Sequence, residues 1–313
     1  MPNEAKPDSD LPSQLVVRTP QLLTPEAASP EAVDGYGIYP EANTLEEIEL
    51  DLLLEAVYRR CGFDFRNYAR PSLRRRVWNA VRLEAVPTIT RLTDMILRDN
   101  DTLDRLLLQL SVNVTSMFRD PGFYKAFREQ VVPLLAAYPF IRVWHAGCAT
   151  GEEVYSTAII FEEEGLYDRC RIYATDMNEL VLQRAKAGIF PIADMQSYST
   201  NYQLAGGKAA FSDYYTARYE AAIFRQSLRR NVLFSHHNLV TDGSFNEFNI
   251  IFCRNVLIYF NTTLQARVHR LLFESLRHFG ILCLGSQEAL RGTPHEQTYE
   301  AIDSREKLYR RIG

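Results

Sequence analysis

The stretch from Ile141 to Asp176 constrains the fold of this chain more than any other part of the sequence. Ile141–Ala146 has the composition of a short buried strand, and a turn of small residues follows it. Apolar residues then recur at helical spacing over about 152–164, and a second strand from Arg171 ends at Asp176. The pattern predicts a strand–turn–helix–strand unit, which is the building block of a doubly wound α/β sheet.

The turn in this unit indicates which ligand it accepts. Gly147 and Gly151 do not have the G-x-G-x-x-G spacing of dinucleotide sites, and Glu152 and Glu153 at the helix start would repel a pyrophosphate. An NAD oxidoreductase is therefore disfavoured. S-adenosylmethionine fits better because it carries a ribose and an ammonium group but no phosphate, and Asp176 is placed to accept hydrogen bonds from both ribose hydroxyls. The unit alone is equally compatible with a plain α/β turn that binds nothing.

Composition and charge exclude several classes of protein. The 313 residues contain neither an apolar run of membrane-spanning length nor a secretory signal, so we expect a cytoplasmic protein without membrane insertion. Its five cysteines are scattered, without metal spacing, which predicts reduced thiols and no metal site. The net charge is −4, but residues 1–50 hold ten acidic and two basic side chains, a balance of −8, which leaves +4 for the remainder. Nothing in this balance suggests nucleic-acid binding.

The helical and strand patterns divide the chain into parts. Residues 1–42 are predicted to be a flexible acidic tail because they are rich in Pro, Ser, Ala and Glu. Residues 43–120 are predicted to form a helical domain. Its helices are expected at about 44–60, 71–84, 88–98 and 101–110. A linker helix is expected over 121–137, with Asp120 as its N-cap, and an α/β domain over 138–313.

Finer predictions concern single elements. A capping box at Thr44 should start the first helix, which we expect to bury Ile48, Leu52, Ala56 and Val57. Residues 188–230 interrupt the strand–helix alternation and predict an inserted antiparallel lobe. Later elements are expected as strands at 231–236, 248–253 and 281–284, a helix from Asn261 to about His278 that Gly280 stops, and a hairpin of 299–302 with 307–311.

Two further segments have a functional interpretation beside a plain one. Residues 59–82 contain eight arginines and one acid, Asp64, which favours a docking surface for an acidic partner over a solvated helix face. Residues 111–120 are either a capped interdomain loop or a segment whose Asn113, Thr115 and Arg119 close over the cofactor pocket.

Four blocks of sequence resemble the chemotaxis receptor methyltransferases, the CheR-type protein-glutamate O-methyltransferases. They are Asn113–Arg119, Gly151–Glu153 with Asp176, Cys253–Phe260 and Gly285–Glu288. The resemblance covers about residues 45–313 in consistent order. It implies an all-helical N-terminal domain followed by a class I (Rossmann-like) methyltransferase domain with a small inserted antiparallel lobe. It also implies methyl transfer from S-adenosylmethionine to glutamate carboxylates of chemoreceptors, with S-adenosylhomocysteine as product, by a protein expected to be a monomer.

The resemblance also implies roles for single residues. Cofactor contacts are expected at Asn113, Thr115, Arg119, Glu153, Asp176, Asn238, Leu239, Asn255 and Val256, with Glu153 favoured over Glu152. Arg119 and Tyr259 are expected nearest the transferred methyl group, and the receptor's methylation helix is expected to contact Arg70, Arg74, Arg75 and Arg76. Departures from the family, in the lobe and in the acidic tail, leave open whether the lobe binds a receptor tail peptide.

The chemistry that the resemblance implies needs no general base. An ionised glutamate is already a nucleophile at neutral pH, since its pKa is about 4.3, and a dry pocket with in-line positioning should supply much of the acceleration. Two alternatives remain open on the sequence: a non-catalytic module that binds S-adenosylmethionine or S-adenosylhomocysteine, and a methyltransferase that acts on a small molecule or another protein.

Overall fold

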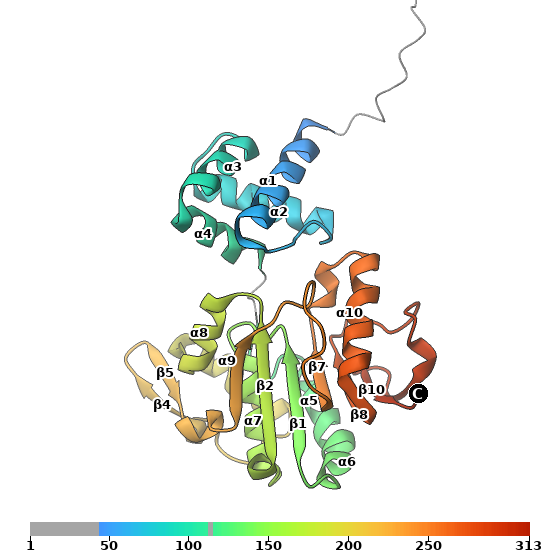
Figure 1. Ribbon diagram of the computed structural model, residues 1–313. Coiled ribbons are helices and arrows are strands. Elements are labelled where there is room, and N and C mark those ends of the chain that lie inside the picture. The colour runs from blue at the N-terminus through green and yellow to red at the C-terminus, as the bar shows by residue number, and fades with distance from the viewer. Residues whose placement is uncertain (1–43, 112–114) are drawn as a thin grey trace, which may run out of the picture. The chain divides into compact units, whose positions relative to one another are not determined.

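The computed structural model describes residues 44–111 and 115–313 of the chain. Helices come first in the sequence, and an α/β domain built on a seven-stranded sheet follows (Figure 1). This architecture confirms the predicted fold class. The flexible tail predicted for residues 1–42 lies outside the described residues. Within the described ranges, no helix is both long and apolar enough to cross a membrane.

The described part of the helical domain consists of four helices. These are α1 (Leu45–Cys61), α2 (Arg70–Leu83), α3 (Ile89–Arg98) and α4 (Asn100–Leu110). Helix α1 starts with the predicted capping box, in which the Thr44 side chain accepts from the Glu47 N–H and the Glu47 carboxylate accepts from the Thr44 N–H. Gly62, in the left-handed conformation, ends the helix.

The buried face of α1 differs from the predicted one. Val57 is buried as predicted and Ala56 is partly buried, but Ile48 and Leu52 are 46% and 59% exposed, and the core instead receives Leu50, Leu53 and Leu54. The sequence of α1 carries apolar residues on two sides, so spacing alone does not decide which side is buried. The packing partners of α1 decide it, and its own sequence does not record them: at the start of α3, for example, the Thr90 N–H donates to the Glu49 carboxylate at 3.1 Å.

The predicted linker helix is present in three continuous parts: α5 (Pro121–Ala126), a π-helical turn (Phe127–Val131) and α6 (Val132–Ala136). The predicted N-cap position of Asp120 is confirmed, but the capping hydrogen bond expected of its side chain is not formed. Asp120 stands at the N-cap position with φ of 59°, but its side chain accepts no cap hydrogen bond. Its carboxylate is drawn away by an ion pair with Arg254.

The large sheet is mixed. Its strands are β1 (Ile141–Ala146), β2 (Cys170–Asp176), β6 (Val232–His236), β7 (Phe248–Cys253), β8 (Leu276–Leu284), β9 (Tyr299–Asp303) and β10 (Leu308–Arg311). The order is β6-β2-β1-β7-β8-β10-β9, parallel from β6 to β8 and antiparallel beyond. The chain winds from β1 toward β2 and later continues at β7 on the other side of β1. This reversal of strand order is where doubly wound sheets bind ligands.

Both faces of the sheet are buried. Along β1, Val143 packs in the core of one face and Trp144 in the core of the other, as strand alternation requires. The helices of this domain are α7 (Glu152–Glu163), α8 (Glu179–Ala187), α9 (Met195–Leu204) and α10 (Thr262–Ser275). Helix α10 ends earlier than predicted, because Leu276 already pairs with Phe248 in the sheet and the residues after it form a bulge.

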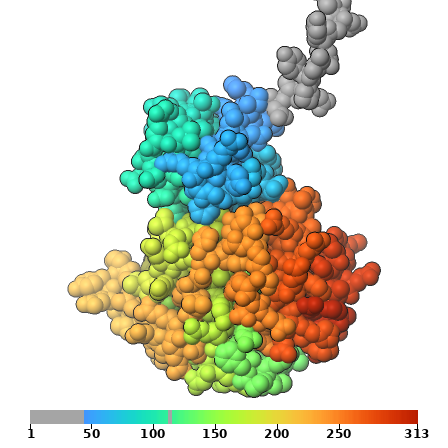
Figure 2. Space-filling view, in the orientation of Figure 1, coloured from blue at the N-terminus to red at the C-terminus, as the bar shows by residue number. Residues whose placement is uncertain are grey.

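The predicted antiparallel lobe is confirmed. It is a three-stranded sheet of β3 (Ile189–Pro191), β4 (Tyr215–Arg218) and β5 (Ala221–Phe224) in the order β3-β5-β4. Tyr155 from α7 packs edge-on against Phe190 and Phe224, which fixes the lobe to the main domain. The β4–β5 hairpin projects from the surface in Figure 2, and Tyr219 at its tip is 93% exposed.

The two neighbouring leucines of α1 provide a matched test of this packing. Leu53→Ala should lower the free energy of unfolding by about 2–5 kcal/mol, because the side chain is fully buried. Leu52→Ala, one residue away and largely exposed, should change it by about 0.5 kcal/mol or less. Urea denaturation followed by circular dichroism measures both, and equal losses would contradict the assignment of the α1 faces.

Candidate functional site

The site is built where three parallel strands end. β1 pairs in parallel with β2 (Ala146 with Thr175) and with β7 (His145 with Phe252), so their carboxyl ends meet at one edge of the sheet. Figure 1 shows the three strands side by side. The loops that leave these ends carry most of the residues predicted as cofactor contacts.

The loop after β1 is held against the neighbouring strand ends. The N–H groups of Gly147 and Cys148 both donate to the Thr175 carbonyl, at 2.9 and 2.8 Å. Gly147 has φ of 76°, and a Cβ there would lie 2.8 Å from a Val256 methyl group. Only glycine therefore permits this close approach without strain.

Asp176, at the end of β2, is a buried carboxylate that organises the same loop. Its Oδ2 accepts from the Ala149 N–H and its Oδ1 from the Asn178 N–H, both at 2.9 Å. Burial raises the pKa of Asp176 above its ordinary value, and these backbone donors only partly offset the rise.

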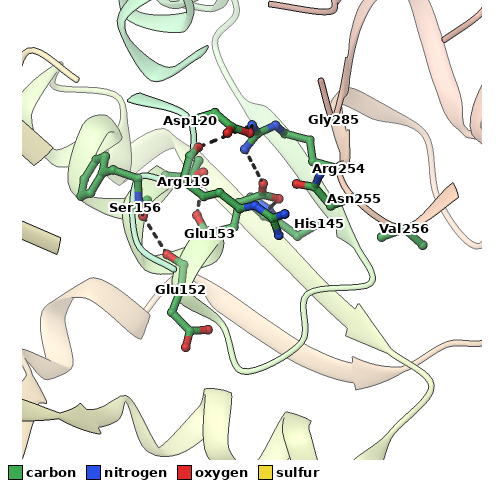
Figure 3. A network of polar contacts seen from close by, with 12 residues as sticks. Arg119, Asp120, His145, Glu152, Glu153, Ser156, Arg254, Asn255, Val256 and Gly285 are labelled. Carbon is green, nitrogen blue, oxygen red and sulfur yellow. Dashed lines mark hydrogen bonds and ion pairs between the residues drawn. The ribbon is translucent and has the colours of Figure 1, made fainter. Parts of the chain in front are cut away.

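The two glutamates at the start of α7 have different environments. Glu152 accepts a hydrogen bond from the Thr150 hydroxyl at 2.6 Å, and its carboxylate points away from the other polar groups in Figure 3. Glu153 receives His145 Nδ1 on one oxygen at 3.0 Å and Arg254 Nη1 on the other at 3.1 Å. Burial raises the pKa of Glu153, but these partners more than offset it, so the pKa lies below its ordinary value.

Arg254, the residue after β7, is a cation almost without solvent contact: its side chain is 2% exposed. Besides Glu153, its guanidinium contacts Asp120 Oδ2 at 2.9 Å and lies 3.8 Å from the ring centroid of Phe123. Burial lowers its pKa, but the Glu153 charge more than compensates and holds the pKa above the usual value. Such a buried ion pair is costly to break by removing one partner.

Glu288 shapes the loop after β7 from behind. Its carboxylate accepts four backbone N–H groups, those of Gly285, Asn255, Val256 and Leu257, at 2.6–3.0 Å. Burial raises the pKa of Glu288, with the backbone donors opposing it. Asn255 adopts a left-handed conformation with φ of 60°, and this carboxylate stabilises the turn that requires it.

These loops enclose a concave site that we call the strand-end pocket. It brings together the predicted Thr115, Arg119, Glu153, Asp176, Asn238, Leu239, Asn255, Val256 and Tyr259. The predicted Asn113 lies outside the described residues. Glu152 does not line the pocket. Unpredicted residues of its wall include Tyr68, Arg76, Met177, His237 and Arg254.

The four arginines predicted to dock a partner separate into three environments. Arg70 forms an ion pair with Asp51 of α1, and Arg74 forms one with Glu46 of the same helix. Arg75 is exposed and forms no ion pair within residues 44–111 and 115–313. Arg76 points the other way, toward the strand-end pocket, and donates to the Leu110 carbonyl at 2.6 Å. The predicted surface is therefore smaller than the sequence suggests.

Comparison with known proteins decides the family. Residues 113–307 match the family model described as the CheR methyltransferase, SAM binding domain, and residues 48–111 match the CheR methyltransferase, all-alpha domain. The chain belongs to the CheR methyltransferase family. A Pseudomonas putida protein named as a methyltransferase, Cher3, is 46% identical over 271 residues, which cover 87% of this chain and 98% of that protein.

More distant members of the CheR family carry a functional name. A chemotaxis protein methyltransferase of Listeria monocytogenes is 30% identical, over 79% of this chain and 92% of its own. That of Salmonella typhimurium is 27% identical, over 78% and 84%. The resemblance stated from the four sequence blocks is confirmed.

S-adenosylmethionine is the cofactor of this CheR methyltransferase, and the strand-end pocket suits it. The buried carboxylate of Asp176 and the partly buried carboxylate of Glu153 suit a ligand that has a ribose and positive charge, and they would repel a phosphate. No group of three His, Cys, Asp or Glu among the described residues is arranged to hold a metal ion.

The sequence interpretation missed Arg254 and Glu288 as determinants of the pocket, although both lie inside quoted blocks. A signal was available for each. Arg254 is a charged residue directly after the wholly apolar end of β7, and Glu288 is an acid four residues after β8. What the sequence does not contain is the partner of each charge.

The predicted contact of Asp176 with the cofactor ribose should make S-adenosylhomocysteine binding depend on pH. The ionised carboxylate is the form that accepts two hydroxyl hydrogen bonds, so affinity should fall as the pH drops through its raised pKa, above the ordinary 3.8. Isothermal titration calorimetry between about pH 7.5 and about pH 5 measures this. Asp176→Asn should bind more weakly and lose this pH dependence; the same pH profile in both proteins would contradict the assignment.

Proposed function

We propose that this protein transfers the methyl group of S-adenosylmethionine to glutamate carboxylates on the cytoplasmic helices of chemoreceptors. The products are glutamate methyl esters and S-adenosylhomocysteine, and the protein acts in the cytoplasm. The proposal is supported by the Listeria and Salmonella relatives, which are named chemotaxis protein methyltransferases. The observation that carries it is the charge distribution of the strand-end pocket.

That distribution suits a cationic methyl donor and an anionic acceptor. The carboxylates of Glu153 and Asp176 line the pocket together with the guanidinium groups of Arg76 and Arg119. The bound cofactor supplies an electrophilic methyl group on a sulfonium. An incoming glutamate is ionised at neutral pH and attacks without a general base, and its charge cancels that of the sulfonium as the bond forms. Exclusion of water therefore favours the reaction.

Arg119 and Arg76 are assigned to orient the acceptor carboxylate. Arg76 is fixed by its hydrogen bond to Leu110 and by the ring of Tyr259, whose centroid lies 4.7 Å from the guanidinium carbon. The Tyr259 carbonyl in turn accepts the Ala69 N–H at 2.8 Å, which ties this wall to the start of α2. Tyr259 forms an aromatic wall on the acceptor side. Arg119 has a second assigned role as a contact of the cofactor, together with the other residues predicted to bind the cofactor.

Tritiated-methyl transfer to purified receptor cytoplasmic fragments tests the function. The expected result is label that alkali releases, because a methyl ester hydrolyses in base, and that fragments with the acceptor glutamates replaced by alanine do not acquire. Arg119→Ala should lose most of the transfer. Alkali-stable label would indicate a methyltransferase of another kind, and tight cofactor binding without transfer to any acceptor would indicate a non-catalytic module.

Arg75 is the best single probe of receptor docking on α2. Arg75→Glu should lower kcat/KM for a receptor fragment roughly three- to tenfold, because it reverses an exposed charge that faces an acidic helix. Cofactor affinity should stay unchanged. Arg98→Glu, the same reversal on an exposed arginine of α3 that pairs with Asp94, controls for the change of charge. An equal loss in both variants, or loss of cofactor binding, would exclude a specific docking role for α2.

A further inference from the structure

The segment from Thr115 to Asp120 carries Arg119 to the strand-end pocket. It is fixed by the fully buried side chains of Met117 and Phe118 and by hydrogen bonds of its backbone. The Phe118 N–H donates to the Ser156 hydroxyl at 2.9 Å, and the Met117 carbonyl accepts from the Asn201 side chain at 3.2 Å. Phe118 and Asp120 both have left-handed backbones, with φ of 51° and 59°. A non-glycine residue in this region is strained, so the surrounding contacts must hold it there.

Arg254 is a further attachment of this segment, at the end that carries Arg119. One of its terminal nitrogens, Nη2, contacts the Asp120 carboxylate at 2.9 Å and the Arg119 carbonyl at 3.5 Å. The other, Nη1, contacts Glu153 at 3.1 Å. Figure 3 shows the side chains of Arg119, Asp120, Glu153 and Arg254 gathered around this point from three segments of the chain.

The geometry of a guanidinium explains why the residue is an arginine. Its planar fork presents donors in two directions, so that a single buried side chain can bind two carboxylates and a carbonyl at once. A lysine ammonium on a flexible stem does not reproduce this arrangement. The Asp120 side chain is 40% exposed and that of Arg254 is 2% exposed, so this ion pair joins a surface carboxylate of the segment to a buried cation.

We propose that Arg254 is a positioning residue which, through Asp120 and the Arg119 carbonyl, holds the Arg119 side chain at the strand-end pocket. The proposal rests on the role assigned to Arg119 in the proposed function. In this proposal the Arg254–Asp120 ion pair affects cofactor binding indirectly, through the position of Arg119, and neither partner has to contact the cofactor. The effect of the pair should therefore depend on the presence of the Arg119 side chain.

A double-mutant cycle separates positioning from general stabilisation. Calorimetry measures the affinity for S-adenosylhomocysteine of four full-length proteins: the unsubstituted protein, Asp120→Asn, Arg119→Ala and the double variant. Asp120→Asn should weaken binding about tenfold, the scale of one hydrogen bond to a charged group. In the Arg119→Ala background the same change should have almost no effect, because two residues that act through one contact are not additive.

A buried arginine elsewhere in the chain supplies the matched control. Arg128, 7% exposed, contacts Glu163 and Glu164 as Arg254 contacts Glu153 and Asp120, but does not line the pocket. Glu164→Gln makes the same carboxylate-to-amide change and should leave the affinity unaltered, whatever it does to the melting temperature. Arg254→Lys, which keeps the charge, should bind S-adenosylhomocysteine as weakly as Asp120→Asn.

Each remaining outcome has a defined meaning. If Asp120→Asn weakens binding equally with and without the Arg119 side chain, or not at all while Arg119→Ala does, the positioning role is wrong and the proposed function stands. A loss of affinity in Glu164→Gln as large as in Asp120→Asn would also reject it. If Arg119→Ala leaves affinity unchanged, the assigned role of Arg119 in cofactor binding is wrong, and this inference falls with it.

Discussion

The parallel pairing of β1 with both β2 and β7 is the constraint from which the site follows. Because the three strands run the same way, the loops after Ala146, Asp176 and Cys253 leave the sheet at one edge. Their backbone N–H groups point into a small volume and need acceptors. Carboxylates meet this need at two places, with Asp176 serving the first loop and Glu288 the last.

Three acidic side chains of this region show how the environment shifts the pKa values of similar groups in different directions. Asp176 and Glu288 are bonded by neutral backbone donors, so burial raises the pKa of each. Glu153 instead faces Arg254 and His145, and its pKa lies below the ordinary value. The pocket thus has one carboxylate fixed as an anion by a buried cation and one whose charge is balanced only by dipoles.

The extent to which the sequence predicts this arrangement depends on how local each feature is. The β1 loop and Asp176 follow from a strand–turn–helix–strand pattern within 36 residues. The family blocks add the preference for Glu153 and the residues around Arg119 and Asn255. The sequence does not reveal the roles of Arg254 and Glu288, because their partners lie on other segments. A sequence alone does not show whether a charged residue is paired in the folded protein. The α1 faces were misjudged for the same reason: Glu49 and Thr90 are 41 positions apart, and no period in α1 records that contact.

The ion pairs between α1 and α2 have a consequence for how any acidic helix is received. Glu46 and Asp51 already neutralise Arg74 and Arg70, so an arriving carboxylate exchanges with a resident counterion instead of meeting a bare cation. In such an exchange the Coulomb energy before and after is similar. Selectivity would then have to come from shape and apolar contact. The number of arginines along α2 would overstate the affinity of this helix for an acidic partner.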